Sequence, residues 1–307
     1  TVAYIAALQD MVLPHVVGAE IDDIPAFNHL LQKRLHLHGR YGITIFAISA
    51  VDTALWDIAA KQQGVSLARL LSDSPRPSIP AYASLVRYGN PEQVAEFTAD
   101  VVARGYRTVK LHEIALDCIE AGVAAAGEGV RVTTDVNCNW SLEEAHRLMP
   151  EMQRLGLYWV EEPVFPPDDA ETLGALQDQY GVSIASGENA CTLTEFRRTI
   201  PKIDFVQPSV TKVGGVSETV AICDAAAAAG KRVMPHSPYF GPGYWATVQV
   251  MAAKPNAELF EFFWIQPEAF IDPTIPKPVG GSITVPDRPG IGFEPDPEVL
   301  AKYRVEV

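Results

Sequence analysis

From about Ile79 onward, short apolar runs alternate with longer amphipathic stretches along the chain. Eight of the short runs are typical of buried strands, because they are rich in Val, Ile, Tyr and Phe and end in turn residues. They are IPAYASL, RTVKLH, VRVTTDV, LYWVEE, VSIASGE, DFVQPS, KRVMPH and AELFEF. The stretches between them, such as SLEEAHRLMPEMQRLG, have the periodicity of helices. Eight strands alternating with about seven helices predict a parallel α/β barrel over residues 79–280.

A doubly wound open sheet would produce a similar alternation of strands and helices. Its dinucleotide-binding form usually has a GxGxxG motif after the first strand, and this sequence has none there. We therefore favour the barrel.

The segments before and after the barrel do not show its alternation of strands and helices. Residues 42–64 (GITIFAISAVDTALWDIAAKQQG) predict a long, largely buried helix, and residues 1–40 look helical and looped. Residues 281–307 are rich in turns, with a strand-like centre. We expect residues 1–78 to form the helical part of a capping domain, to which residues 281–307 return, with the last twenty-odd residues packed against residues 1–40.

The amino-acid composition and net charge argue against some classes of binding partner. The chain has 307 residues, of which 48% are hydrophobic, and a net charge of −14 without a basic run. Nucleic acid and anionic membranes are therefore not expected partners. The four cysteines are scattered without a CxxC pair, which is typical of free thiols rather than a disulfide frame or a zinc site. We recognise no signal peptide and no apolar run of membrane-spanning length, and expect a cytoplasmic protein.

Three acidic residues end three successive strand-like runs. Asp135, Glu161 and Glu188 are 26 and 27 residues apart, each about one strand-and-helix unit. They should therefore meet at the C-terminal ends of neighbouring barrel strands, where barrel enzymes keep their active sites. A single acid there is more simply explained as a charge at a helix N-terminus. Three acids at equivalent positions in successive strand-and-helix units favour a metal site, and carboxylate oxygens are ligands that suit Mg²⁺.

The pair Glu161 and Glu162 raises the question of which acid faces the site. Successive side chains on a strand point to opposite faces, so only one of the two can point into the barrel. Its buried carboxylate would be costly without a partner. We expect Glu161 to meet the metal and Glu162 to face the other way.

Other polar residues occur at the same strand ends. Lys110 and His112 are two residues apart, so both should point into the barrel mouth. His236 and Glu261 end the last two strand-like runs, and Asn137 follows Asp135 at the same-face spacing. A lone histidine is more often structural than catalytic. An inward lysine beside a metal-bound anion has a clear electrostatic role.

These residues resemble the enolase superfamily, in its mandelate racemase and muconate lactonizing subgroup. The matching pieces run in order from about residue 40 to the C-terminus. They are AISAVDTALWDIAAKQQG, TVKLHE, DVNCNW, YWVEEP, SGENA, QPSVTKVGG, MPHSPY, LFEF and SITVPDRPGIGFEPD. The resemblance implies a modified TIM barrel, (β/α)₇β, with an α+β capping domain built from both chain ends. The usual three-stranded start of that cap is missing from this sequence.

The resemblance also implies roles for the strand-end residues. Asp135, Glu161 and Glu188 would be the Mg²⁺ ligands, Lys110 would hold the substrate carboxylate, and Glu261 would hydrogen-bond it. The catalytic residues would be Lys110, His112 and His236, with the two histidines as base and acid on opposite faces of the substrate. Asn137 is expected to bind substrate.

Two positions depart from the family pattern. His112 stands where a second lysine is usual, and a neutral imidazole can still accept a proton. Ser209 stands where racemase-like members place an aspartate that pairs with the histidine, and lactonizing members a lysine. Ser209 can do neither, so His236 lacks its usual partner. Lys212, three residues on, is a candidate substitute.

The site implies removal of the proton α to a carboxylate, through a metal-stabilised enediolate. Because the histidine dyad is broken at Ser209, we favour a dehydratase of a hydroxy acid over a racemase, epimerase or cycloisomerase. A barrel that has lost catalysis and only binds metal and ligand is the alternative of another class. Aromatic segments near the mouth, SPYFGPGYW and FEFFWIQ, favour a cyclic or less polar small carboxylate. We also expect a homo-oligomer.

Overall fold

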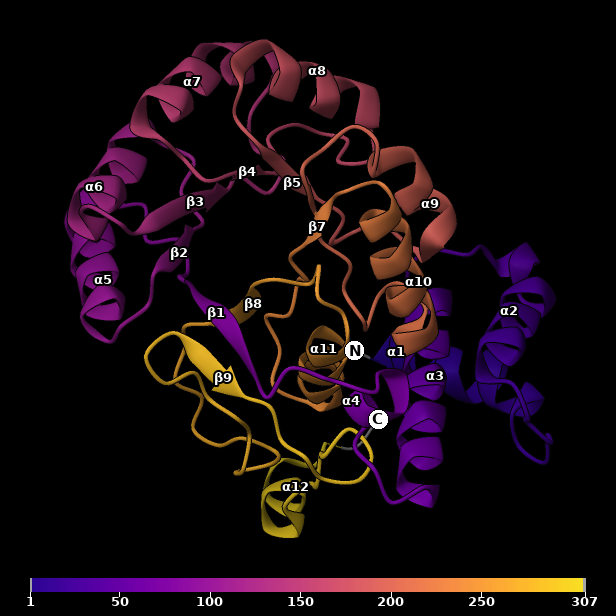
Figure 1. Ribbon diagram of the computed structural model, residues 1–307. Coiled ribbons are helices and arrows are strands. Elements are labelled where there is room, and N and C mark those ends of the chain that lie inside the picture. The colour runs from indigo at the N-terminus through magenta and orange to yellow at the C-terminus, as the bar shows by residue number, and fades with distance from the viewer. Residues whose placement is uncertain (1, 306–307) are drawn as a thin grey trace.

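In a computed structural model of the chain, which describes residues 2–305, eight parallel strands form a barrel surrounded by helices (Figure 1). The strand order is β7-β6-β5-β4-β3-β2-β1-β8, and a parallel bridge between Val233 and Ala257 joins β7 to the segment before β8, which closes the barrel. The predicted (β/α)₇β barrel is confirmed. The strands are β1 Ser78–Ser84, β2 Thr108–Leu111, β3 Arg131–Asp135, β4 Val160–Glu161, β5 Ile184–Ser186, β6 Phe205–Val206, β7 Arg232–Val233 and β8 Phe260–Phe263.

Seven helices connect these strands on the outside of the barrel (Figure 1). Local sequence explains their ends: Ser141 and Glu144 form a capping box at the start of α7, and Gly156 ends that helix with a left-handed conformation. Asn90 caps α5 ahead of Pro91. The helices are α5 Pro91–Ala103, α6 Leu116–Ala126, α7 Leu142–Leu155, α8 Ala170–Tyr180, α9 Thr192–Thr199, α10 Gly215–Ala228 and α11 Pro242–Ala253.

A buried cluster fills the barrel interior beneath the strand-end residues. It contains Tyr82, Trp159, Phe205 and Met234, none of which is exposed to solvent. Tyr82 and Trp159 pack edge to face, with ring centroids 5.6 Å apart. This packed floor supports the side chains at the mouth and keeps water from reaching them from below.

The segment before the barrel is helical and packs against the outside of α10. Its long helix α3 has the length and composition of a membrane-spanning helix, which contradicts the expectation that no apolar run reaches that length. Half of that window is buried within the protein, and α3 contacts α2, α4 and α10. The elements are α1 Val2–Ala6, η1 Ala7–Val12, η2 Leu13–His15, α2 Ile24–Arg34, η3 His36–His38, α3 Ile43–Gln62 and α4 Leu67–Leu71.

The C-terminal segment returns to the start of the barrel and to the preceding helices (Figure 1). Strand β9 (Ser282–Thr284) pairs antiparallel with the first residues of β1. Beyond it, the Ile291 amide donates to Asp57, and Arg69 pairs with Asp287 at 2.8 Å. The C-terminal segment thus contacts residues 57–69. The sequence had predicted that it would pack against residues 1–40. The last helix is α12 (Pro297–Tyr303).

Candidate metal centre and active site

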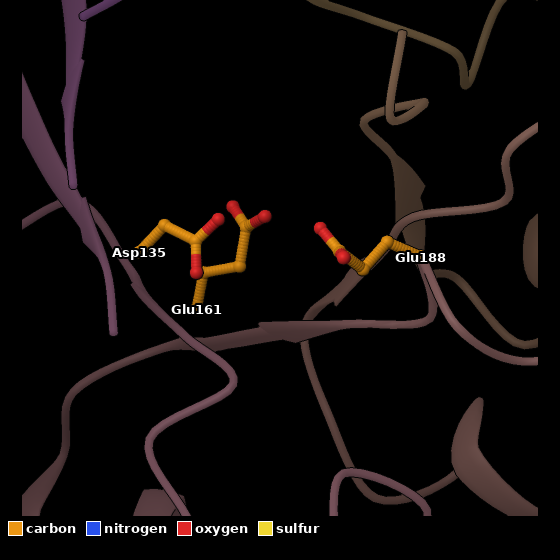
Figure 2. A group of neighbouring side chains, drawn as sticks. All are labelled: Asp135, Glu161 and Glu188. Carbon is orange, nitrogen blue, oxygen red and sulfur yellow. The ribbon is translucent and has the colours of Figure 1, made fainter. Parts of the chain in front are cut away.

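Three carboxylates converge at the C-terminal mouth of the barrel. Asp135 is the last residue of β3, Glu161 the last of β4, and Glu188 lies two residues beyond β5. One oxygen of each lies within 4.8 Å of the others, and Figure 2 shows Glu188 facing the other two carboxylates. The three acids therefore meet at the barrel mouth, as their spacing in the sequence predicted.

Glu162 points away from this group. Its backbone has a positive φ of 41°, because the chain turns sharply after β4, and its carboxylate lies against Cys138 Sγ (3.7 Å) and Asn189 Nδ2 (3.3 Å). Burial and the charges of Glu188 and Asp135 raise the pKa of Glu162 to about 8. The two adjacent glutamates therefore occupy different environments, although both are buried.

Lys110 is fully buried among carboxylates. Its Nζ lies 2.7 Å from Glu161 and 3.1 Å from both Asp135 and Glu261. Burial opposes its charge, but the three carboxylates outweigh that effect and hold the pKa of Lys110 well above its ordinary value. The lysine is therefore a permanent cation at the base of the mouth.

Glu261 is held rigidly on β8. Its Oε1 accepts from Ser84 Oγ (2.8 Å), and its Oε2 accepts from the backbone amide of Ser237 (2.9 Å). Burial alone would raise its pKa, yet Lys110, His236 and the Ser237 amide lower the pKa of Glu261 to about 2. Both oxygens are thus engaged by the protein, and Glu261 lies beside Lys110. The hydrogen bond expected from Glu261 to the substrate carboxylate stays a prediction.

His112 lies next to Lys110, as the two-residue spacing predicted. Its Nδ1 is 2.5 Å from the Leu85 carbonyl oxygen, and its Nε2 is 3.4 Å from Asp135 Oδ2. Because a carbonyl can only accept, Nδ1 must carry a proton. Burial and the charge of Lys110 lower the pKa of His112. The neutral ring therefore presents its lone pair at Nε2, toward the carboxylates.

His236 lies on the other side of the carboxylate group, with Nε2 3.2 Å from Glu188 Oε2. Its buried Nδ1 has no hydrogen-bond partner within residues 2–305. Ser209 instead contacts Thr211 Oγ1 (3.2 Å) and the Tyr239 hydroxyl (3.3 Å). Burial lowers the pKa of His236 despite the opposing charge of Glu188.

The rim of the mouth carries Asn137 and two cations. Asn137 has a φ of 46°, and its Oδ1 accepts from Arg87 Nη2 at 3.2 Å. Arg87 also donates to the His112 carbonyl (2.5 Å), which the sequence did not lead us to expect, although its place three residues after β1 could have indicated it. Lys212 Nζ lies 3.9 Å from Glu188 and 3.4 Å from Asn189 Oδ1, and so faces the triad rather than replacing Ser209.

Most of the aromatic residues that suggested an apolar mouth pack elsewhere. Phe262 neighbours Glu261 on β8 and therefore points to the outer face, where it contacts Phe240 and Trp264. Trp264 in turn packs against Tyr106. Tyr239, whose ring centroid is 6.4 Å from that of His236, and Phe263, on the same face of β8 as Glu261, lie near the mouth. The segments therefore support a less polar substrate only weakly.

The donor set fits a hard divalent cation. All three groups offer carboxylate oxygens, the kind of ligand that Mg²⁺ prefers. Burial and the charge of Asp135 raise the pKa of Glu161, and bound positive charge would relieve this crowding. Asp135 Oδ2 is buried, and its contacts with Lys110 Nζ (3.1 Å) and His112 Nε2 (3.4 Å) are not well-oriented hydrogen bonds. A lone pair of this oxygen is therefore available to a metal.

Comparison with protein families gives two matches that together span most of the chain. Residues 93–299 match the family described as Enolase C-terminal domain-like. Residues 2–72 match the mandelate racemase / muconate lactonizing enzyme, N-terminal domain. The boundary between the two matches lies close to the start of the barrel at β1.

Individual relatives agree with these families. The arabinonate dehydratase of Saccharolobus solfataricus is 30% identical over 87% of this chain and 74% of its own length. The D-galactarolactone cycloisomerase of Agrobacterium fabrum is 28% identical over 90% and 78%. The 3,6-anhydro-D-galactonate cycloisomerase structure from Zobellia galactanivorans superposes with a TM-score of 0.90, at 24% identity over 98% of this chain and 87% of that one.

Proposed function

The chain belongs to the mandelate racemase and muconate lactonizing enzyme group of the enolase superfamily, and we propose that it is a Mg²⁺-dependent dehydratase of a hydroxy acid. Enzymes of this kind are lyases or isomerases. The observation that carries the proposal is the position of His112 and His236 on either side of the acid triad. Lys110 lies at its base.

Asp135, Glu161 and Glu188 would hold the Mg²⁺ ion. When bound, the ion supplies positive charge to the substrate carboxylate, which makes the adjacent α-proton more acidic. Lys110 adds a second, permanent positive charge at the same place, because its pKa stays well above the ordinary value. The neighbouring Glu261 fixes the position of the lysine ammonium.

His112 would remove the α-proton. A base must be unprotonated, and burial with the Lys110 charge keeps this ring neutral near pH 7. The contact between Nδ1 and the Leu85 carbonyl orients the ring and leaves Nε2 free to accept the proton. This contact does for the histidine what a carboxylate partner does in other proton-transfer sites.

His236 would deliver a proton to the leaving hydroxyl, for which the ring must be in its imidazolium form when substrate binds. Burial opposes that form, and the charge of Glu188, 3.2 Å from Nε2, favours it. The C–H electron pair becomes the new C=C bond as the β-carbon–oxygen bond breaks, and the hydroxyl leaves as water with the proton from His236. With a 2,3-dihydroxy acid the product is an enol, which tautomerises to a 2-keto-3-deoxy acid. Without an acidic partner at Ser209, His236 is better suited to donate one proton than to act as a matched second base.

The substrate we favour is a polyhydroxy acid. Arabinonate dehydratase and the L-talarate/galactarate dehydratase of Salmonella typhimurium, 31% identical over 83% of this chain, act by name on such acids. The rim residues Arg87, Asn137 and Lys212 are hydrogen-bonding groups that suit hydroxyls. Asn137 would bind the substrate through its side-chain amide.

Isomerisation is the second candidate. Two histidines on opposite sides of a triad can exchange a proton on both faces of one carbon, and two of the relatives are cycloisomerases. The two reactions share the first proton transfer and differ in their products. A barrel that binds metal and ligand without turnover would show neither.

The test follows the α-proton and the product separately. The purified protein with Mg²⁺ is incubated in deuterated water with a panel of aldonates and aldarates, and NMR records deuterium uptake and 2-keto-3-deoxy acids. We expect His112→Asn to abolish uptake, and His236→Asn to retain uptake while losing product. His38→Asn, at an exposed position in η3, is the matched control. Uptake at the wild-type rate in His112→Asn would refute the assignment of the base.

A further inference from the structure

We propose that a cationic pocket outside the barrel binds a small organic oxyanion. The pocket lies between α2 of the cap and helices α9 and α10 of the barrel, which adjoin in the fold (Figure 1). Its volume is about 610 Å³, within the range of small-molecule sites. The charged and titratable side chains in its walls are His29, Lys33, His36, Arg40, Arg197 and Glu218.

The three permanent cations of the pocket have no acidic partner. Lys33, Arg40 and Arg197 form no ion pair within 4.0 Å with any residue between 2 and 305. Arg40 donates only to neutral groups, Gln32 Oε1 (3.1 Å) and Thr192 Oγ1 (3.2 Å). In a chain of net charge −14, unpaired cations gathered around one cavity are unexpected and favour an anionic ligand.

The acids near the pocket are already occupied by other donors. Glu218, in the wall, accepts from Gln32 Nε2 and from the Leu193 amide, each at 2.7 Å. Asp52, beneath the floor, accepts from Asn28 Nδ2 (2.7 Å) and from the hydroxyl and amide of Ser217. Neither carboxylate pairs with a cation, although the charge of Glu218 remains in the wall. Three cations against one carboxylate leave the walls with a net positive charge.

The remaining walls indicate the class of ligand. Pro25, Leu193 and Ala221 contribute apolar surface between the charged side chains. A bare inorganic ion would not use this surface, whereas the carbon skeleton of an organic molecule would. Three cations and one carboxylate leave two positive charges in excess. This excess suits a group with at least two negative charges, which a phosphate monoester or a polycarboxylate provides. The shared chemistry is a multiply charged oxyanion on a small carbon body.

Isothermal titration calorimetry tests the proposal on the full chain with excess Mg²⁺. The probes are glucose 6-phosphate, tricarballylate and, as the inorganic arm, sulfate, at constant ionic strength. We expect one of the organic anions to bind and sulfate to bind at least tenfold more weakly. The double variant Lys33→Gln/Arg197→Gln should weaken that binding at least tenfold. Arg34→Gln, an exposed neighbour on the same helix outside the pocket, should leave it unchanged.

Each outcome decides the question. Binding that survives in the double variant places the anion elsewhere, such as at the barrel mouth, and overturns the proposal. Absence of binding for both organic probes overturns the proposal too. If Arg34→Gln weakens anion binding as much as the double variant does, the effect comes from net charge alone, and the proposal is also overturned. Lys33→Arg/Arg197→Lys, which keeps the charges, should bind within threefold of wild type. Catalysis at the mouth is measured separately, so failure here leaves the proposed function untouched.

Discussion

At the scale of single residues, the site is a balance between one buried lysine and four carboxylates. Lys110 contacts Asp135, Glu161 and Glu261, and none of these side chains is more than 1% exposed. Removing one partner of a buried charge network leaves the others uncompensated, which costs about 3–5 kcal/mol. The lysine is therefore as important for the stability of the mouth as for its chemistry.

We predict that Lys110→Met lowers the free energy of unfolding by about 3–5 kcal/mol when Mg²⁺ is absent. Urea denaturation followed by circular dichroism gives this quantity. The control is Lys202→Met, because Lys202 pairs with Glu171 on the surface, where such a pair contributes about 1 kcal/mol or less. If the two variants lose the same unfolding free energy, the buried network contributes no more to stability than a surface ion pair.

A second prediction concerns the pH dependence of proton removal. A base works in its neutral form, and the pKa of His112 is lowered from the ordinary value of 6.5. As pH falls, the ring stays neutral until the pH reaches that lower pKa, so α-proton exchange should persist below pH 6.5. Exchange in deuterated buffers, measured against pH, should have its acidic midpoint below 6.5. A midpoint above that value would mean that His112 is not the base.

The sequence anticipated these residues unevenly. Glu161 and Glu188 could be predicted because one strand-and-helix unit separates them, and the alternation of side chains distinguished Glu161 from Glu162. Arg87 was missed. Its place three residues after β1 indicates only that it lies near the mouth, because its contacts with His112 and Asn137 depend on how a loop folds over the rim. The packing of Phe262 away from the mouth depends on which face of β8 it occupies.

At the scale of elements, the alternation of strands and helices was readable, but the lengths of the strands were not. Strands β4, β6 and β7 have only two residues each, although the apolar runs that predicted them are longer. The extent of a strand depends on hydrogen bonds to its neighbours, which one run of sequence does not specify. The pairing of β9 with β1 joins segments about 200 residues apart and is equally invisible locally.

The packing of α3 on α10 provides a prediction at this scale. Asp52, in the middle of α3, accepts two hydrogen bonds from Ser217 and one from Asn28. Burial raises its pKa from 3.8 to about 6, despite these bonds. Between pH 4 and pH 6 the unfolded chain releases this proton while the folded chain retains it, so the folded state loses stability as the pH rises.

Two pKa units correspond to about 3 kcal/mol. We therefore predict that the loss in unfolding free energy between pH 4 and pH 7 is smaller by about 3 kcal/mol in Asp52→Asn than in wild type. Asparagine has a single side-chain oxygen, so it cannot accept both from the Ser217 amide, as Oδ2 does, and from the Ser217 hydroxyl and Asn28, as Oδ1 does. The variant should therefore also be less stable than wild type at pH 4. Denaturant titrations at the two pH values supply the comparison. An unchanged pH dependence would contradict the burial argument.

At the scale of the whole molecule, the acid triad brings negative charges from three neighbouring strands together, and these charges repel one another. Asp135, Glu161 and Glu188 come from β3, β4 and the end of β5, so their mutual repulsion acts across the mouth of the barrel. A cation that binds the folded state and not the unfolded chain stabilises the fold by about 2.7 kcal/mol at a concentration one hundred times its Kd. Metal binding should therefore be visible as stability of the entire chain.

We predict that Mg²⁺ raises the melting temperature of the wild-type protein and that Glu161→Gln abolishes this rise. Glu162→Gln is the matched control, because Glu162 is the adjacent buried acid and contacts Cys138 and Asn189 instead of the triad. Because its pKa is raised to about 8, Glu162 is largely protonated near pH 7, and glutamine replaces a nearly neutral group. The control should therefore keep the response to Mg²⁺ and melt close to wild type without the metal. Scanning fluorimetry with increasing Mg²⁺, against Na⁺ at equal ionic strength, measures both variants. If Glu162→Gln loses the response and Glu161→Gln keeps it, the assignment of the two glutamates is reversed. If both keep it, Mg²⁺ binds outside the triad.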